Sequence, residues 1–447
     1  MRHVALLFVA AAAAAAPPPA FDPDAVTAAV ARLSHPDYRT REAAGASIVR
    51  AGDRALPLVR TALAGCTDPE SARRLEVLAE RLDGERLRTP RRVTLRAKAA
   101  PLKDVLADIT AQTGYVVKIA DADGGSAPRP STPVTADIVD LPFLQALDVL
   151  CDQNDLAHVC QDDAGVITVS AEPTLDPHKA YTGPFRVTAT QIYTSGNVQL
   201  AGRPRHAPLV RTPEQVTLTL AVEAEPKAAL LGLGPVKVLA ATDDLGHNLV
   251  PAASDEDGND HPLADLNTTD GFGARGPTQA FAQSCQVSLA RADRKATVIK
   301  TLKLQFSATL VAETVVTGGI DDMFGAKAKG KTLADRRASL ELVQATTADG
   351  MVTIEVTARR TPAGPNDDSN GWAYEMVSRV QVVDAKGVPY AVQNRTITDS
   401  NPTTVSFKQT FARPQHRRVG KPVRLQLVDR LPRSQDVTVT LTDIPLP

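Results

Sequence analysis

The stretch RVTLRAKAAPLKDVLADITAQTGYVVKI, residues 92–119, predicts a strand, a helix and a second strand. Residues Arg92 to Arg96 alternate polar and apolar side chains, as a half-buried strand does, and Pro101 to Ile109 place apolar residues at helical spacing. Pro101 suits the first turn of that helix and Gly114 suits its end, after which Tyr115 to Ile119 resume a strand.

The next part of the chain repeats this order of elements. We expect a strand over Val134–Val139, a helix over Pro142–Leu150, and closing strands over Leu156–Cys160 and Val166–Val169. Residues 91–171 are therefore predicted to form a small βαββαββ domain.

This pattern over residues 92–170 resembles the secretin and TonB short N-terminal (STN) domain, a small module of the bacterial envelope. The resemblance implies a segment that docks proteins or signals and catalyses no reaction. The pore strands of secretins do not follow it in this sequence, so a transport role is not implied.

The N-terminus has the pattern of an export signal. Arg2 and His3 precede an apolar run from Val4 to Ala16, and small residues follow to Ala20. We expect residues 1–20 to be a signal peptide and the mature chain to be periplasmic or extracellular; the alternative is an uncleaved anchor. No later stretch reaches the ~20 apolar residues of a spanning helix, so no transmembrane segment is expected in the mature chain.

The composition describes an ordinary globular protein of several domains. A length of 447 residues predicts three or four domains, and an aromatic content of 4% predicts aliphatic cores. A net charge of -1 gives no general attraction to nucleic acid.

Residues 21–84 have helical periodicity and resemble a short HEAT-type pair of helical hairpins. We expect Asp24 to cap a helix over Ala25–Leu33, Asp37 or Thr40 to begin the next, and Asp68 with Pro69 to begin the last. The region is either a docking cap or a plain helical bundle. The arginines between Arg81 and Arg96 could form a basic patch for an acidic partner, but they lack the interleaved aromatics of single-stranded nucleic-acid sites, which favours a solvated linker.

Beyond a linker, the chain is predicted to consist of strands and turns. Two antiparallel β-sandwich domains, immunoglobulin-like in architecture, are expected over residues 183–325 and 335–447. They look like repeats, because Leu302–Phe306 matches Val423–Leu427 and the same offset aligns Asp322 with Asp443. Turns at 242–246 and 383–387 also match. The fold class is thus multidomain α+β: a helical region, a small βαββαββ domain and two tandem sandwiches.

The four cysteines are Cys66, Cys151, Cys160 and Cys285. Cys151 ends a predicted helix and Cys160 lies in the next strand, so a Cys151–Cys160 disulfide is expected in an oxidising compartment. Two buried free thiols are the equal alternative. No spacing of cysteines indicates a zinc site.

The only ionic candidate is an acidic loop whose oxygen ligands suit calcium. Its residues are Asp255, Asp257, Asn259 and Asp260. The loop lacks the glycine and glutamate positions of an EF-hand, so a solvated loop is the favoured interpretation. No catalytic residue and no other cofactor is predicted. The lone Trp372 is expected in the core of the last sandwich.

Together these features predict a non-enzymatic, exported binding or scaffold protein of the bacterial envelope. It would dock a protein partner through exposed strand edges and the small α/β domain. A carbohydrate- or calcium-binding adhesin-like protein and a hydrolase with an unrecognised site are the alternatives.

Overall fold

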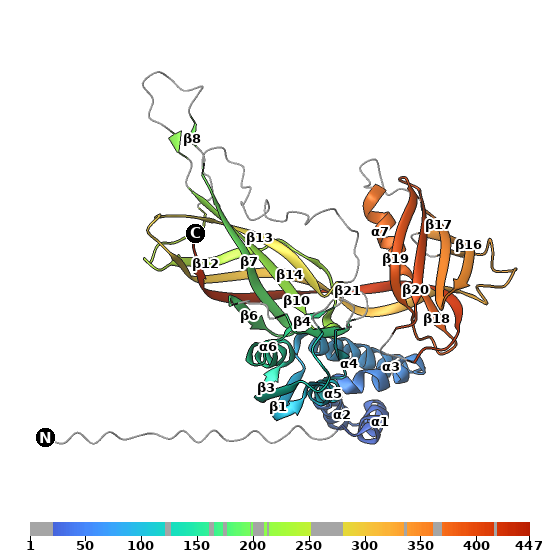
Figure 1. The fold of residues 1–447 in the computed structure, drawn as a ribbon. Helices are drawn as coiled ribbons and strands as arrows, with labels where there is room; N and C mark the ends of the chain where they lie inside the picture. The colour runs from blue at the N-terminus through green and yellow to red at the C-terminus, as the bar shows by residue number, and fades with distance from the viewer. Residues whose placement is uncertain are drawn as a thin grey trace. The chain divides into compact units, whose positions relative to one another are not determined.

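The computed structural model describes residues 21–120, 127–160, 165–172, 177–196, 198–199, 210–211, 214–251, 280–334, 338–360, 369–414 and 418–447. The chain divides into two compact units, Met1–Arg86 and Leu87–Pro447 (Figure 1). The predicted α+β class with mainly antiparallel sheets is confirmed. None of the described helices is long and apolar enough to cross a membrane.

The first unit is helical. Its elements are α1 (Pro23–Ala31), η1 (Arg32–Ser34), α2 (Tyr38–Arg50), η2 (Gly52–Ala55), α3 (Leu56–Ala64) and most of α4 (Pro69–Arg88). Their amphipathic faces share a core of mostly small and branched aliphatic residues, including Val26, Ile48, Val59 and Leu82.

Side-chain caps fix where these helices begin. The Asp37 carboxylate accepts hydrogen bonds from the N–H groups of Arg39 and Thr40, so Asp37 caps α2. Asp68 accepts from the Ser71 N–H at 2.9 Å and caps α4 in the same way. The predicted cap of α1 was wrong by two residues. Asp22, not Asp24, caps the helix, because Pro23 occupies its first turn.

The second unit begins with the small α/β domain. Its elements are β1 (Arg92–Pro101), α5 (Leu102–Thr113), β2 (Val117–Ile119), β3 (Pro133–Pro142), α6 (Phe143–Gln153), β4 (Ala157–Cys160) and β5 (Ile167–Ser170). This is the predicted βαββαββ order. β1 pairs antiparallel with β3, while β2, β5 and β4 form a separate three-stranded sheet.

The two halves of this domain match in detail. β1 and β3 have the same alternation of exposed and buried residues, and each contains a bulge residue with positive φ, Ala99 (49°) and Asp140 (51°). The Thr135 hydroxyl accepts from the Ala99 N–H, and the Thr94 hydroxyl accepts from the Asp140 N–H. The repeated sequence pattern therefore encodes a repeated geometry, down to the hydrogen bonds at each bulge.

On each of these two strands, a side-chain amide hydrogen-bonds both the N–H and the carbonyl of one residue. Gln112 accepts from the Thr94 N–H at 3.0 Å and donates to the Thr94 carbonyl at 2.8 Å. Asn154 does the same for Thr135, at 2.8 and 3.0 Å. Each amide takes the place that the backbone of a neighbouring strand would occupy, so these positions cannot accept an added strand.

The β region continues with strands β6 to β14. Their bounds are β6 (Lys179–Thr182), β7 (Phe185–Ser195), β8 (Val198–Gln199), β9 (Val210–Arg211), β10 (Gln215–Ala224), η4 (Pro226–Ala228), β11 (Leu230–Leu233), β12 (Lys237–Asp243), β13 (Ala282–Ala290) and β14 (Val298–Asp321). The remaining elements are β15 (Thr332–Ala334), β16 (Ala338–Ala348), β17 (Met351–Arg360), α7 (Ser369–Arg379), β18 (Val380–Asp384), β19 (Ala391–Ser400), β20 (Thr404–Ala412) and β21 (Pro422–Pro445).

Three large sheets and the two-stranded β8-β9 sheet make up the described part of this region. The first outer sheet has the order β13-β10-β7-β6, and the second outer sheet has the order β15-β16-β17-β20-β19. A central sheet has the order β11-β14-β21-β18, with β12 also paired to β14. In the two outer sheets, β6, β7, β10 and β13 correspond to β15, β16, β17 and β20, and they pair in the same order. The predicted repeat is therefore present in the topology, with β19 added to the second copy.

The two sandwiches share the central sheet. β14 and β21 each span 24 residues and pair along almost their whole length (Figure 1). The first half of β14 packs in the core of the first sandwich, while Ile320 near its end packs in the second. Conversely, Leu425 and Leu427 of β21 belong to the second core and Val437 to Ile444 to the first. Each core therefore takes residues from both sides of the expected boundary near residues 325–335.

Matching turns mark the repeat at the residue level. The Asp243 carboxylate accepts from the N–H groups of Leu245 and His247, and that of Asp384 accepts from those of Lys386 and Val388. Gly246 and Gly387 follow with φ of 86° and 77°, which glycine adopts without strain. These carboxylates are thus turn-forming groups.

The second sandwich also contains a helix. α7 ends at Arg379, and β18 starts directly after it at Val380. Trp372 is buried in the second core as predicted, yet it lies on α7 rather than on a strand. Its indole N–H donates to the Asn401 carbonyl, and the Arg360 guanidinium stacks 4.8 Å from its ring centroid.

Candidate docking groove

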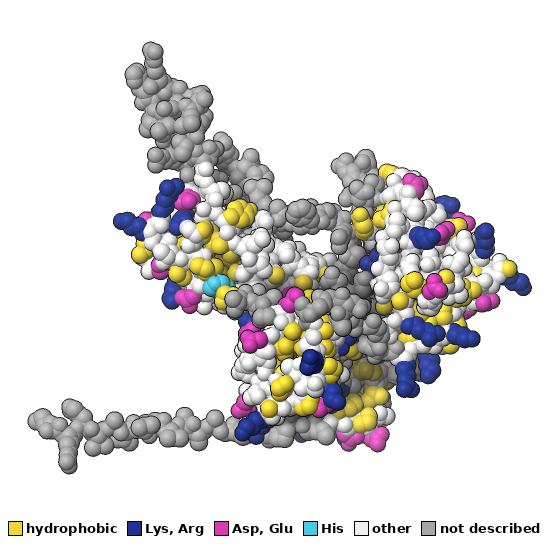
Figure 2. All heavy atoms as spheres, in the orientation of Figure 1, with side chains coloured by type: hydrophobic (Ala, Val, Ile, Leu, Met, Phe, Trp, Pro, Cys, Tyr) yellow, Lys and Arg dark blue, Asp and Glu magenta, His cyan; other side chains and the backbone are white. Residues whose placement is uncertain are grey.

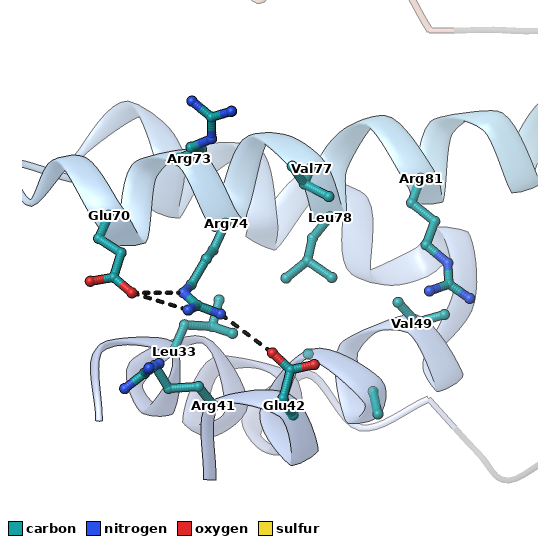
Figure 3. A pocket seen from close by; sticks show the side chains of 12 residues that line it. Leu33, Arg41, Glu42, Val49, Glu70, Arg73, Arg74, Val77, Leu78 and Arg81 are labelled. Atoms are coloured by element: carbon teal, nitrogen blue, oxygen red, sulfur yellow. Dashed lines mark hydrogen bonds and ion pairs between the residues drawn. The ribbon is translucent and has the colours of Figure 1, made fainter. Parts of the chain in front are cut away.

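A solvent-open groove of about 480 Å³ lies between α2 and α4 of the helical unit (Figure 3). Its walls come from residues that recur every three or four positions on each helix, which places them on one face. The lining residues are Leu33, Arg41, Glu42, Gly45, Ala46, Val49, Glu70, Arg73, Arg74, Val77, Leu78 and Arg81. We call this site the α2–α4 groove.

The middle of the groove is apolar. Leu33 is buried, Val49 and Leu78 are half-buried, and Val77 remains 59% exposed. Figure 3 shows Leu78 pointing from α4 toward α2. A single exposed valine needs no explanation, but here it continues a contiguous apolar strip that water contacts from one side.

Arg74 bridges the two helices. Its guanidinium lies 3.5 Å from a Glu42 oxygen on α2 and 3.0 Å from a Glu70 oxygen on α4 (Figure 3). The bridge engages both glutamates of the groove.

The other arginines have different environments. Arg41 donates from one terminal nitrogen to the carbonyls of His35 at 2.8 Å and Pro36 at 2.9 Å. Arg81 pairs with Glu85 at 3.2 Å. In the part of the chain that the structure describes, neither Arg41 nor Arg73 has a carboxylate within salt-bridge distance. The lining residues include no serine, cysteine, histidine or metal ligand set, so the groove is suited to binding.

A second polar constellation lies in the interior of the large unit, between the small α/β domain and the first sandwich. The Asp148 carboxylate on α6 is the centre, and it contacts His158 Nε2 at 2.9 Å, Lys179 Nζ at 3.4 Å, the Arg186 guanidinium and the Tyr181 hydroxyl. Arg186 also pairs with Glu223 on β10. We call this set the Asp148 cluster.

Electrostatics favour the charged form of Asp148. Burial alone raises the pKa of its carboxyl, but the hydrogen bond with His158 and the charge of Arg186 outweigh burial, and the net pKa lies well below the ordinary value of 3.8. Asp148 therefore stays ionised at any physiological pH, and the cluster acts as a structural tie between α6, β6 and β7.

Glu225 forms a smaller tie nearby in sequence. Its buried carboxylate accepts from the Arg91 N–H at 3.1 Å and from the Tyr115 hydroxyl at 2.8 Å, with Lys227 Nζ at 3.7 Å. Burial raises the pKa of Glu225 above its ordinary value of 4.5, despite the nearby Lys227 charge and these hydrogen bonds. Both ties join the small domain to the β region through groups far apart in the sequence.

The sequence-predicted site residues have three outcomes. No disulfide joins Cys151, which is buried, to Cys160, which is half-buried. Burial raises the pKa of Cys151 to about 12, so its thiol is unreactive. The proposed calcium ligands Asp255, Asp257, Asn259 and Asp260 lie outside the described residues, as does the predicted signal peptide over residues 1–20.

Two further candidate features resolve into ordinary structure. Arg86 pairs with Asp83 at 2.9 Å, and Arg92 with Asp140 at 2.7 Å, so these arginines are compensated by local carboxylates. Within the described parts of the chain, no group of three or more His, Cys, Asp and Glu side chains could hold a metal ion. On the face shown in Figure 2, basic and acidic side chains both occur, with small apolar patches between them.

Sequence reasoning pointed to the small α/β domain and did not single out the α2–α4 groove. The signal was present: Glu70, Arg73, Arg74, Val77, Leu78 and Arg81 form one helical stripe that mixes arginine with aliphatic residues. Such a stripe does not reveal whether the facing helix packs against it or leaves it open. That distinction depends on the spacing of α2 and α4.

No protein-family model and no curated protein matches the chain. Among solved structures, the chain is similar to one described as the crystal structure of the conserved domain protein from Bacillus anthracis. The identity is 10%, the match covers 59% of this chain and 89% of that chain, and the TM-score is 0.14. A likeness at that TM-score carries no argument about fold or function.

Proposed function

We propose that this chain is a non-enzymatic, exported binding or scaffold protein of the bacterial envelope, which docks a protein partner in the α2–α4 groove. The carrying observation is the groove itself, with an apolar floor, arginine walls and no reactive side chain. Arginine is enriched at protein interfaces relative to the rest of the surface, and the centre of an interface is more apolar than its rim.

Gly45 supports a binding role. It lies inside α2 without a positive φ, and a Cβ at this position would meet only Leu78 Cδ2 at an ordinary 3.9 Å. A glycine inside a helix costs about 0.5–1 kcal/mol relative to alanine. Neither the backbone conformation nor crowding requires a glycine at position 45. The absence of a side chain there leaves the groove floor unfilled.

The large unit supports a scaffold role. The Asp148 cluster and the Glu225 contacts fix the small α/β domain to the first sandwich, and β14 and β21 tie the two sandwiches together. A body joined in this way resists hinge motion between its parts. The resemblance of residues 92–170 to the STN domain belongs to the same proposal, as a second docking surface for envelope proteins.

Site-specific photocrosslinking tests the groove. A benzoylphenylalanine at Val77 is expected to crosslink a discrete protein in cells that produce the chain, whereas the same residue at exposed Ala28 on α1 is not. Replacing Ala46 with tryptophan should fill the groove and remove the Val77 crosslink. Equal crosslinking from both positions, or none from Val77, would contradict docking in the groove.

Fractionation tests export separately. The tagged full chain is expected in the periplasmic or extracellular fraction, and deletion of residues 2–20 should retain it in the cytoplasm. Identical fractionation of the two forms would remove the export part of the proposal.

A further inference from the structure

Building on the proposed docking function, we propose that the α2–α4 groove binds an acidic amphipathic helix of a protein partner. The lining residues include the four arginines Arg41, Arg73, Arg74 and Arg81 and two glutamates, Glu42 and Glu70. Both glutamates pair with Arg74 alone. Arg41 and Arg73 are left as positive charges on the walls, in a chain whose formal net charge is only -1.

The positive surplus comes from side chains and not from the helix ends. The N-termini of α2 and α4 are the positive ends of their dipoles, but Asp37 and Asp68 cap them. The hydroxyl and N–H of Thr40 hold the pKa of Asp37 below its ordinary value, and the hydroxyl and N–H of Ser71 do the same for Asp68. They therefore offset the dipoles and are already engaged.

Arg41 is held in place before any partner arrives. Two backbone carbonyls fix one terminal nitrogen, its guanidinium carbon lies 5.7 Å from the Tyr38 ring centroid, and its buried Nε has no hydrogen-bond partner. The two carbonyls engage Nη1 and burial closes off Nε, so Nη2 is the nitrogen that can donate to a carboxylate of a partner.

The walls favour a helical partner over an extended one. They are side chains of two helices whose own backbone groups are bonded within each helix, so an extended segment would find no backbone partners there. A helix satisfies its own backbone and presents apolar residues at i, i+3, i+4 and i+7 to Leu78, Val77 and Val49. Lining residues on α4 extend from Glu70 to Arg81, a length of about 17 Å or three turns.

Fluorescence anisotropy with three synthetic 18-residue peptides tests the charge preference. The peptides share one leucine stripe at helical spacing and carry glutamate, glutamine or lysine on the flanking positions. With the full chain at about 50 mM salt, the glutamate peptide is expected to bind at least threefold more tightly than the glutamine peptide, and the lysine peptide most weakly. Screening at about 300 mM salt should bring the three within twofold.

Charge reversal supplies the matched control. Arg73→Glu should abolish the preference for the glutamate peptide and raise affinity for the lysine peptide, while Arg39→Glu, on an exposed part of α2 outside the groove, should do neither. Circular dichroism checks that both variants remain helical.

The outcomes separate the two proposals. Peptides that bind with equal affinity, but lose binding in Ala46→Trp, would overturn the acidic partner and leave groove docking intact. Binding that survives Ala46→Trp, or no binding by any peptide, would overturn both. An acidic peptide that binds equally well with helix-breaking prolines would replace the helical partner with an extended one.

Discussion

The two buried carboxylates that tie the small α/β domain to the first sandwich should respond oppositely to neutralisation. Asp148→Asn removes the centre of a cluster in which Arg186, Lys179 and His158 surround one carboxylate. Glu225→Gln keeps an oxygen that can accept from the Arg91 N–H and the Tyr115 hydroxyl. The first change removes a buried carboxylate that Arg186 and Lys179 share, and the second removes a charge that burial disfavours.

The magnitudes follow from burial. Removing one partner of a buried ion pair costs about 3–5 kcal/mol, so Asp148→Asn should lower the free energy of unfolding by that amount. At about 2 °C per kcal/mol for a large unit, the melting temperature should fall by roughly 6–10 °C. Glu225→Gln should stay within about 1 kcal/mol of the wild type at pH 7, since the lost Lys227 contact is offset by the relieved burial of charge.

The pH dependence has opposite signs for the two groups. The folded pKa of Asp148 is lowered, so its stabilisation is present above the ordinary 3.8 and is lost as the pH falls through the folded value. The folded pKa of Glu225 is raised, so its contribution is present below the ordinary 4.5 and is lost as the pH rises through the folded value. Relative to wild type, Glu225→Gln should therefore gain stability between pH 4 and pH 7, while the Asp148→Asn penalty stays constant from pH 5 to 8.

Urea unfolding of the full chain, followed by circular dichroism at pH 4, 5 and 7, measures both effects. Asp152→Asn is the matched control, because Asp152 lies one turn further along α6 and its side chain is 55% exposed. A penalty below about 1 kcal/mol for Asp148→Asn, or above about 2 kcal/mol for Glu225→Gln, would refute the assignment of these two roles.

Three further substitutions test the packing. Gly45→Ala should stabilise the helical unit by about 0.5–1 kcal/mol, measured by hydrogen exchange of α2 amides, because the new Cβ meets only Leu78 at 3.9 Å; faster exchange would show that the glycine is structurally required. Gln409→Met should stabilise the second core by about 1–3 kcal/mol in urea unfolding, because Gln409 is 0% exposed and neither amide atom has a partner among the described residues; a loss of stability would indicate that a bound water satisfies the amide. Gly183→Ala should cost more than Gly350→Ala, because both glycines have positive φ but only at Gly183 would a Cβ meet a backbone oxygen, that of Arg88, at 2.8 Å; equal melting temperatures for the two variants would count against this clash.

Local pattern was enough to predict the elements of the small α/β domain. Alternation in β1, helical spacing in α5 and the glycine at Gly114, with φ of 76°, are properties of neighbouring residues. The repeat of the β strands was also visible in the sequence, because the offset that aligns its strands also aligns Asp322 with Asp443. In the structure, both residues have positive φ, 50° and 54°. Trp372 was placed in the core, but its helix was missed because a short helix before β18 leaves little periodicity.

The candidate site could not be predicted in the same way. The stripe on α4 is readable in the sequence, but whether it is covered depends on how α2 packs against α4 in the shared core. Likewise, Cys151 and Cys160 are close enough in sequence to suggest a disulfide, yet no disulfide joins them in the structure.

What the sequence by itself determined is the set of elements, their order and their duplication, because each follows from side-chain periodicity over a few residues. What only the tertiary structure decided is how distant elements combine. Three features show this. β14 and β21 each contribute residues to both cores. Asp148 and Glu225 are buried against the β region, and the space between α2 and α4 stays open. The reason is that such contacts join residues far apart in the chain, and their free energy depends on burial and geometry that no local pattern encodes.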